Sequence, residues 1–347
     1  MTTDRPDQQL DRAEGALLGL AIGDALGMPT QLLTRAEVVD RYGGVLEWFE
    51  PAHADHPVAA GQPAGSVTDD TEQALLLARL LVDGDGRVDP TVWAGVLRAW
   101  EADLVRRGSA DLLGPSTRRA LDALAAGVPP EQAGQDGTTN GAAMRIAPVG
   151  LAVPLDGSRA GVELLAAAVA EVSRVTHGTD VALAGATAVA AAVSTAAGGE
   201  AVETAITAAI DAAPAGAALG RPTAAPSLHR LIRAACDVVR GLPAADVADL
   251  VDHQVGTGLA TTESVPAAFA VLAAIPDDPW AACRVAASLG GDSDTIAAMV
   301  GAVAGACSGA SAFPPAARHL VEEVNGLTNG QLAGLATGLL RIRTRAR

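Results

Sequence analysis

The amino-acid sequence predicts an all-α protein, and three observations support this fold class. Apolar residues recur at helical spacing along most of the chain, whereas β-branched and aromatic residues never alternate over the length of a strand. Alanine, which has the highest intrinsic helix propensity, dominates the periodic segments. Because 49% of the 347 residues are hydrophobic, the chain also has enough apolar side chains to fill a sizeable core.

The helices are expected where apolar periodicity runs between breaks made by Gly and Pro. Before the break at Gly127-Val128-Pro129-Pro130, the expected helices are Gly15–Leu26, Thr71–Val82, Thr91–Arg106 and Pro115–Ala126. Up to the next break at Pro276-Asp277-Asp278-Pro279, they are Arg159–Val175, Asp180–Ala197, Ala201–Ala212, Ser227–Arg240, Ala244–Gln254 and Ser264–Ala274. The last ones are Pro279–Ser288, Thr295–Ser308 and Pro315–Asn325.

Two segments are expected to be flexible loops, Glu50–Gly65 and Ala213–Pro226. His53 and His56 lie in the first of them and are expected to be exposed to solvent. Neither loop is long or polar enough to link two domains. We therefore expect one domain over residues 10–345, although about 150 residues per domain would allow two.

The charge balance excludes two classes of partner. The 24 basic residues are all arginine, and 40 acidic residues give a formal net charge of −16. Nucleic acids and anionic membranes attract clustered basic residues, so neither is an expected partner. The most membrane-like stretch, residues 296–313, consists of Ala, Gly, Val and Ser, which favours a buried helix packed through small residues.

The cysteines and the N-terminus indicate the compartment. Cys236, Cys283 and Cys307 are widely spaced and form no C-x-x-C pair, which excludes a disulfide framework and a zinc knuckle. Residues 1–12 have three aspartates and no apolar core, unlike a secretory signal. We expect a soluble, cytoplasmic protein.

Two acidic clusters carry most of the chemical information, and each stands where a helix begins. The first is Ser66-Val67-Thr68-Asp69-Asp70-Thr71-Glu72 and the second is Gly290-Gly291-Asp292-Ser293-Asp294-Thr295. Helix capping explains either cluster taken alone. Capping needs one oxygen per helix, however, and adjacent like charges are costly unless a cation compensates them. If the fold brings the clusters together, this all-oxygen set suits a hard cation, Mg²⁺ first, with Mn²⁺ or Ca²⁺ as alternatives.

Three further elements are candidates for the site. The small residues of Gly137–Arg145 would let backbone N–H groups face a phosphate, although an ordinary Gly/Asn turn also explains them. Asp24 lies in an apolar helix, and a buried carboxylate needs a partner. His177 stands between two apolar helices, where a structural role is the alternative to a functional one.

Taken together, these elements resemble the ADP-ribosylglycohydrolase family. The resemblance rests on Gly15–Gly27, Thr68-Asp69-Asp70-Thr71, Asn140–Arg145, Thr176-His177 and Gly290–Thr295, in that order, and covers residues 12 to 310. The pair T-D-D-T and G-G-D-x-D-T at this separation is highly specific.

The resemblance implies a compact, orthogonal bundle of helices with a binuclear Mg²⁺ site, in which Mn²⁺ is an alternative. It implies that two ions are held by the first and second clusters, through Thr68, Asp69, Asp70, Asp292, Asp294 and Thr295. It further implies substrate contacts from Asp69, from His177, and from the backbone of Asn140, Gly141, Ala142, Ala143 and Met144. The implied reaction is hydrolysis of an N- or O-glycosidic bond, in which a metal-oriented water attacks the ribose anomeric carbon. The implied substrate is ADP-ribose on a modified protein side chain or on a small molecule.

The sequence departs from the family pattern at two places. Gln31 stands where relatives commonly have a glutamate that binds metal or acts as acid or base. An amide oxygen can bind Mg²⁺ but takes no proton at neutral pH. Either Asp70 or Asp294 then serves as the base, or a metal-bound hydroxide suffices, or the activity is altered. The segment Gly256–Leu259 has no aromatic ring where relatives often have one near the ligand. These departures leave two alternatives open, a hydrolase of a smaller N-riboside such as a nucleoside or nucleotide, and a non-catalytic member of the family.

Overall fold

A computed structural model describes residues 6–108 and 113–346 of the chain. Within them the chain forms helices and no strand, and two isolated bridges (Thr139 with Ala260, Thr179 with Arg221) are the only β-pairing. The all-α prediction is confirmed. The helices are α1 (Pro6–Gly27), α2 (Arg35–Tyr42), α3 (Asp69–Asp83), α4 (Pro90–Arg107), α5 (Pro115–Ala125), α6 (Pro130–Ala133), α7 (Gly141–Met144), α8 (Ala147–Ala152), α9 (Arg159–Ser173), α10 (Asp180–Ala197), α11 (Val202–Ala217), α12 (Leu228–Val238), α13 (Ala244–Gln254), α14 (Thr261–Ala274), α15 (Pro279–Ala287), α16 (Ser293–Ser308), the 3₁₀ turn η2 (Ala310–Ala312), α17 (Pro315–Val324) and α18 (Asn329–Arg345).

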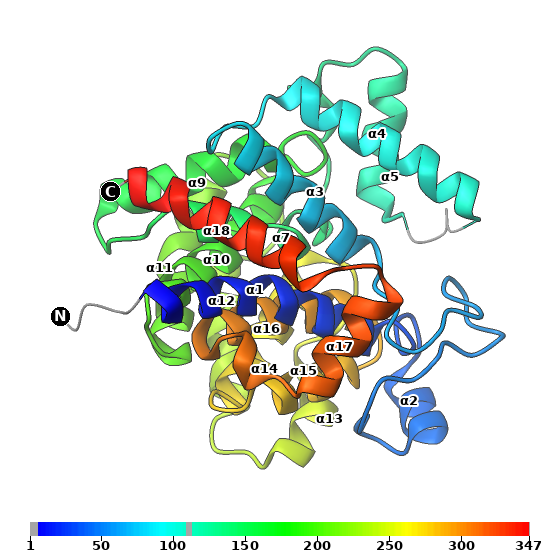
Figure 1. The fold of residues 1–347 in the computed structure, drawn as a ribbon. Helices are drawn as coiled ribbons and strands as arrows, with labels where there is room; N and C mark the ends of the chain where they lie inside the picture. Colours follow the sequence, from blue (N-terminus) through cyan, green and yellow to red (C-terminus); the bar gives the residue numbers. More distant parts are fainter. Residues whose placement is uncertain (1–5, 109–112, 347) are drawn as a thin grey trace.

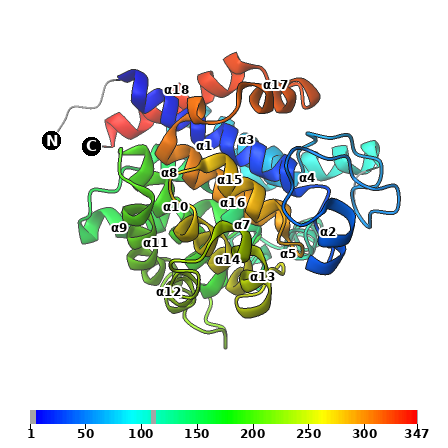
Figure 2. The same ribbon diagram turned by 90° about the horizontal axis from the view of Figure 1, so that it is seen from below.

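Helices α1 and α16 pack side by side through the middle of the molecule (Figures 1 and 2). Every fourth residue of one face of α1 is glycine, and each faces the backbone of α16. A Cβ atom on Gly23 would lie 1.9 Å from the carbonyl oxygen of Ala297, and one on Gly19 would lie 2.2 Å from that of Gly301. The two helices therefore touch backbone to backbone. They run antiparallel, so the end of α1 lies beside the start of α16.

Other helices surround this pair. Helices α4 and α5 lie together at one end of the molecule, away from α11 and α12 (Figures 1 and 2). Among the described residues, α10 is the one helix long and apolar enough to cross a membrane, but 89% of it is buried inside the protein. The expectation of a buried helix in residues 296–313 fits α16, in which Ile296–Ala306 are all buried.

The start of α1 and the end of α11 differ most from the sequence prediction. Helix α1 begins at Pro6 rather than Gly15, because its polar first turns carry no apolar periodicity. The loop predicted over Ala213–Pro226 is wrong for its first residues, since α11 continues through Pro214 to Ala217. Burial explains this continuation: Gly216 approaches Thr187 of α10 so closely that a Cβ would lie 2.3 Å from its Oγ1.

Helices α2, α6, α7, α8 and α18 were not predicted. Helix α2 has only eight residues, too few to show a period, but it begins with a capping box in which the Thr34 side chain accepts from Glu37 N–H and Glu37 accepts from Thr34 N–H. Helix α18 begins after Thr328, whose side chain accepts from Gln331 N–H. Cap signals, rather than hydrophobic periodicity, mark the start of both helices.

Candidate active site

The fold brings the two acidic clusters together. Asp70 is in the first turn of α3 and Thr295 is in the first turn of α16. The hydroxyl of Thr295 donates to Asp70 Oδ2 at 3.4 Å, and the hydroxyl of Thr68 donates to the same oxygen at 3.2 Å. Carboxylate oxygens of Asp24, Asp70 and Asp294 lie within 4.8 Å of one another, and all three residues are buried. The four carboxylates of two clusters that are far apart in the sequence, with Asp24 as a fifth, thus share one interior site.

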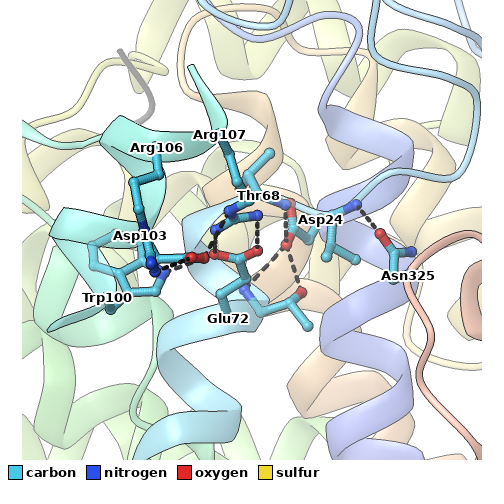
Figure 3. Close-up of polar contacts among 10 residues, drawn as sticks. Asp24, Thr68, Glu72, Trp100, Asp103, Arg106, Arg107 and Asn325 are labelled. Atoms are coloured by element: carbon cyan, nitrogen blue, oxygen red, sulfur yellow. Dashed lines mark hydrogen bonds and ion pairs between the residues drawn. The ribbon is translucent and has the colours of Figure 1, made fainter. Parts of the chain in front are cut away.

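Helix capping does not explain these clusters. Thr68 and Asp292 occupy the N-cap positions of α3 and α16, but neither side chain makes a capping hydrogen bond to a described residue. The first turn of α3 instead donates to a residue of another helix, Asp24 of α1 (Figure 3). Asp24 accepts from the backbone N–H of Thr68 and Thr71, from the Thr68 hydroxyl at 2.8 Å, and from the Thr71 hydroxyl at 2.5 Å. The Thr68 hydroxyl hydrogen lies near Asp24 and Asp70, which leaves its oxygen lone pairs for a cation.

The sequence indicates that Asp24 is a buried carboxylate in need of a partner, but it predicts no role for Asp24 as a metal ligand or catalytic group. Its partners come from α3, 44 and 47 residues further along the chain. The local sequence around Asp24 carries no signal that names them. Only the close packing of α1 against its neighbours brings them within reach.

The first turn of α3 is also held from two other sides (Figure 3). Glu72 accepts a hydrogen bond from Trp100 Nε1 at 2.7 Å and two from the guanidinium of Arg107, both at 2.9 Å. On the other side, Asn325 accepts from Val67 N–H at 3.0 Å and donates to the carbonyl of Gly65 at 2.8 Å. Asp69 and Asp70 therefore stand on a rigid helix start.

The predicted phosphate loop adjoins the acidic clusters. The side-chain amide of Asn140 donates to Asp292 Oδ2 and, at 2.9 Å, to Ser264 Oγ. Gly141–Met144 form the short helix α7, in which Ala143 and Met144 N–H bond to the Asn140 carbonyl. The N–H of Asn140 bonds to the Leu259 carbonyl at 3.1 Å. Of the backbone amides predicted to meet a diphosphate, those of Gly141 and Ala142 therefore remain without a described backbone acceptor.

His177 lies behind this loop and is fully buried. A Cβ atom on Gly141 would lie 2.7 Å from the His177 ring, so the glycine is required for this contact. The ring nitrogens bond to Thr176 Oγ1 at 2.8 Å and Thr139 Oγ1 at 3.0 Å. Burial, and then the positive charge of Arg145, hold the pKa of His177 well below its usual value, so the ring is neutral. His177 does not line the cavity; its predicted nucleotide contact stays a prediction, and it reaches the cavity through Thr139.

A cavity of about 100 Å³ lies over the acidic clusters. Its polar wall consists of Gln31, Asp69, Thr117, Thr139, Asn140, Asp292, Asp294 and Thr295, and its apolar wall of Leu32, Val58, Leu113, Met144 and Leu259, with Gly114, Pro115 and Gly141 between them. Asp70 and Thr68 lie beneath this wall. Small-molecule sites usually have roughly 300–1,000 Å³, so the enclosed part holds a sugar-sized group rather than a whole dinucleotide.

The expectation that His56 is exposed is wrong. Its side chain is 4% exposed, and its Nδ1 accepts from Val58 and Ala59 N–H at 3.3 and 2.9 Å. These bonds fold the loop over residues 50–65 back on itself and place Val58 in the cavity wall. Sequence composition predicted a loop here but not that it covers the site.

Gln31 lies at the cavity in a strained turn. It is 7% exposed, and its side-chain amide nitrogen donates to the Met28 carbonyl at 3.4 Å. The next residue, Leu32, has a φ of 59°, a left-handed conformation that costs a leucine about 1–3 kcal/mol. Leu32 N–H bonds to the Gly291 carbonyl at 2.5 Å, and Gly291 N–H bonds to the Leu33 carbonyl at 2.7 Å. This pair of bonds joins the Gln31 turn to the second acidic cluster.

A larger cavity of about 560 Å³ lies elsewhere, between α11 and α12. Its wall combines apolar Ile206 and Ile210 with exposed charges such as Arg233 and Asp237. It contains none of the buried carboxylates described above. The chemistry therefore places the candidate active site in the smaller cavity.

The residues of the site fit a divalent cation. No described residue donates a hydrogen bond to Asp70 Oδ1, although this oxygen is buried. An unpartnered buried carboxylate oxygen is costly, and a hard cation is the partner that an all-oxygen set of donors suits. Without a cation, burial raises the pKa of Asp24 and Asp292 to about 6, and burial and neighbouring carboxylates raise the pKa of Asp69, Asp70 and Asp294 well above its ordinary value.

These shifts predict how the stability of the metal-free protein depends on pH. Because the pKa of each carboxyl is higher in the folded chain than the unfolded value near 3.8, folding favours the protonated form. The stability that these groups contribute is present below pH 4 and is lost as pH rises through about 6. We expect the melting temperature of chelator-treated protein to fall between pH 4.5 and about 7, and Mg²⁺ to reverse most of the fall. A melting temperature that rises with pH over this window would contradict this reading of the site.

Comparisons with known proteins find relatives along most of the chain. The family model described as ADP-ribosylglycohydrolase matches residues 5–346. The protein YegU of Escherichia coli (strain K12), described as uncharacterized, is 35% identical over 318 residues, which cover 91% of this chain and 93% of that protein. The ADP-ribosylarginine hydrolase Tri1 of Pseudomonas putida (strain GB-1) is 37% identical over 154 residues, 42% of this chain and 37% of that one. A solved structure titled ADP-ribosylglycohydrolase-related protein complex superposes with a TM-score of 0.70 at 29% identity, covering 97% of this chain and 99% of that one.

Proposed function

Since the chain belongs to the ADP-ribosylglycohydrolase family and is therefore a glycosyl hydrolase, we propose that it removes ADP-ribose from a modified side chain with the help of two Mg²⁺ ions. Mn²⁺ is the alternative cation. The observation that carries the proposal is the union of the two acidic clusters around Asp70, whose Oδ1 lacks a partner among the described residues.

The residues of the chain have distinct tasks in this proposal. Thr68, Asp69 and Asp70 hold cations from the start of α3, and Asp292, Asp294 and Thr295 hold them from the start of α16. When bound, the cations supply positive charge that holds the ribose hydroxyls and orients a water molecule. The carboxylates in the cavity wall stabilise the positive charge that develops at the anomeric carbon as the glycosidic bond breaks.

Asp294 is the better placed of the two candidate bases. It lines the cavity, whereas Asp70 lies beneath the wall. Asp294 Oδ1 accepts from the N–H of Thr295 at 2.9 Å. We assign this oxygen to the cation and Oδ2 to the proton of the attacking water. Asn140 and Thr139 face the cavity beside it and orient the substrate.

Gln31→Glu is expected to raise turnover. The variant places a carboxylate in the cavity wall, where the glutamine amide accepts no proton. General acid–base catalysis contributes roughly 10²–10⁴-fold, and because Asp294 already serves as base, we expect the lower end of this range or less. Initial rates on one ADP-ribosylated peptide at saturating Mg²⁺ test this expectation. An unchanged rate would show that position 31 does not take part in proton transfer.

The proposed function itself is tested with arginine- and serine-linked ADP-ribosyl peptides, with and without Mg²⁺. Release of ADP-ribose that depends on the cation supports it. No release from either peptide by a folded, cation-binding protein would reject it.

One observation favours a second candidate, hydrolysis of a smaller N-riboside. The enclosed cavity of about 100 Å³ has an aliphatic wall, and none of its described wall residues is aromatic. A free nucleoside needs fewer contacts outside the cavity than ADP-ribose does. Turnover of nucleosides alone in the same assay would favour this candidate.

A further inference from the structure

Arg145 is a buried cation that the proposed reaction does not use. It follows α7, is 1% exposed, and its guanidinium lies 5.4 Å from the centre of the Trp93 ring. Among the described residues, no carboxylate forms an ion pair with it. Burial without a paired carboxylate lowers the pKa of Arg145 to about 10. Such a charge is expensive to bury, so its hydrogen bonds require an explanation.

The first set of bonds leads to a candidate metal ligand. Arg145 Nη1 donates to Gln73 Oε1, and Gln73 Nε2 donates to Asp69 Oδ2 at 3.0 Å. Gln73 is fully buried and lies one helical turn after Asp69 on α3. Asp69 lines the cavity.

The second set leads to the opposite wall of the cavity. Arg145 Nη2 donates to Thr176 Oγ1 at 2.5 Å, and this oxygen lies 2.8 Å from His177 Nδ1. The other ring nitrogen, Nε2, lies 3.0 Å from Thr139 Oγ1. Thr139 lines the cavity beside Asn140.

A guanidinium group can only donate hydrogen bonds, and this fixes the direction of both chains. Gln73 must turn its oxygen toward Arg145, so its NH₂ group faces Asp69. The Thr176 hydroxyl oxygen accepts a hydrogen bond from Arg145, so the Thr176 hydroxyl hydrogen is donated to His177 Nδ1. The neutral His177 ring then carries its hydrogen on Nε2 and donates to Thr139, whose hydroxyl hydrogen is left to face the cavity.

We propose that Arg145 is a positioning residue that sets the direction of these two hydrogen-bond chains at once. One chain holds Asp69 as a fixed acceptor with its second oxygen turned to the cation, and the other presents the Thr139 hydroxyl as a donor to an oxygen of the substrate. This inference rests on the proposed function for the identity of the two ligands, Mg²⁺ and ADP-ribose. One hydrogen-bond chain is expected to affect cation binding and the other substrate binding, so mutations can separate the two effects.

The test interrupts each hydrogen-bond chain separately by a substitution and measures ligand binding rather than turnover. Gln73→Met removes the donor to Asp69, and Thr176→Val removes the link to His177. Calorimetry gives the dissociation constant for Mg²⁺, and then that for ADP-ribose at saturating Mg²⁺. Loss of an outer partner of a metal ligand typically costs 10–100-fold in affinity. We expect Gln73→Met to weaken Mg²⁺ binding by about this factor and to change ADP-ribose binding little. We expect Thr176→Val to weaken ADP-ribose binding by a similar factor and to change Mg²⁺ binding little.

Variants of Arg145 and a nuclear magnetic resonance measurement complete the design. Arg145→Met should raise both dissociation constants. Arg145→Lys should return one of them to its wild-type value, since an ammonium group reaches only one of the two hydrogen-bond chains. In the wild type, the ¹⁵N shifts of His177 should show a neutral ring with hydrogen on Nε2, and this signature should be lost in Thr176→Val. If Gln73→Met does not fold, Thr176→Val and Arg145→Lys still test the inference.

Arg343→Met is the matched control for the loss of a buried arginine. Arg343 is 2% exposed and donates to the carbonyls of Gly150 and Ser194, away from the site. Its loss should lower the melting temperature and leave both constants unchanged. Folded Arg145→Met with wild-type constants, or equal changes of both constants in the two single-chain variants, would overturn the inference. A wild-type protein that binds no ADP-ribose would instead reject the proposed function.

Discussion

Asp70→Asn is expected to abolish cation-dependent activity while making the metal-free protein more stable. Asp70 Oδ2 accepts from hydroxyls of both acidic clusters, and its Oδ1 has no described hydrogen-bond donor, so Asp70 is the carboxylate that both clusters share. Its loss should weaken Mg²⁺ binding and lower the hydrolysis rate by about 10²-fold or more. The same change removes a buried carboxyl. The pKa of this carboxyl is raised by burial and by four neighbouring aspartates. One unit of raised pKa corresponds to about 1.4 kcal/mol, so we expect the metal-free variant to gain at least about 1 kcal/mol at pH 7.

These opposite effects are measured by calorimetry with Mg²⁺, by hydrolysis assays, and by thermal denaturation in a chelator. Asp122→Asn, which changes an exposed carboxylate on α5, is the control and should alter none of the three. If Asp70→Asn destabilised the metal-free protein, the carboxylates would not be under mutual repulsion. If it kept wild-type Mg²⁺ affinity, the cation site would lie elsewhere.

Gly23→Ala is expected to cause a large loss of folding stability although it adds only one methyl group. The added carbon would lie 1.9 Å from the carbonyl oxygen of Ala297, 2.4 Å from its carbonyl carbon and 2.9 Å from the nitrogen of Ala298. These are backbone atoms, so no side chain can move aside, and α1 must separate from α16. Overpacking usually costs 1–3 kcal/mol, and we expect about 3 kcal/mol or more here.

Urea denaturation with and without Mg²⁺ measures this loss. The control is Gly95→Ala in α4, where an added Cβ would meet no atom within 4 Å. There, the better helix propensity of alanine should raise stability by about 0.5–1 kcal/mol. Similar effects at the two positions would show that the contact between α1 and α16 is looser than described. Gly23→Ala should also weaken Mg²⁺ binding, because Asp24 moves with α1.

Much of the fold could be predicted from the sequence because most helices have apolar faces or clear Gly and Pro boundaries. The exceptions have physical causes. Helix α2 is too short for periodicity, and its capping box, Thr34 with Glu37, was the only local signal. Pro214 resembles a helix breaker, but packing of α11 against α10 overrides it.

The candidate site could be predicted in its parts but not in its assembly. Clustered aspartates are visible in a sequence because they are adjacent, whereas the bond from Thr295 to Asp70 spans 225 residues. For the same reason, no role as a metal ligand or catalytic group could be predicted for Asp24, and no positioning role could be predicted for Arg145. Their partners are distant in the chain, and only tertiary structure defines them.

The antiparallel contact of α1 with α16 has a consequence for how the protein folds during its synthesis. The residues that meet there, such as Gly19 and Gly301, are far apart in the sequence. During synthesis, α1 emerges from the ribosome first and must wait for α16 before its glycine face is covered. Contacts between residues so far apart slow folding, because a long loop must close before they form. A nascent chain that ends before residue 290 therefore holds one acidic cluster without the other, and the protein gains its chemistry only after residues 290–295 have been added.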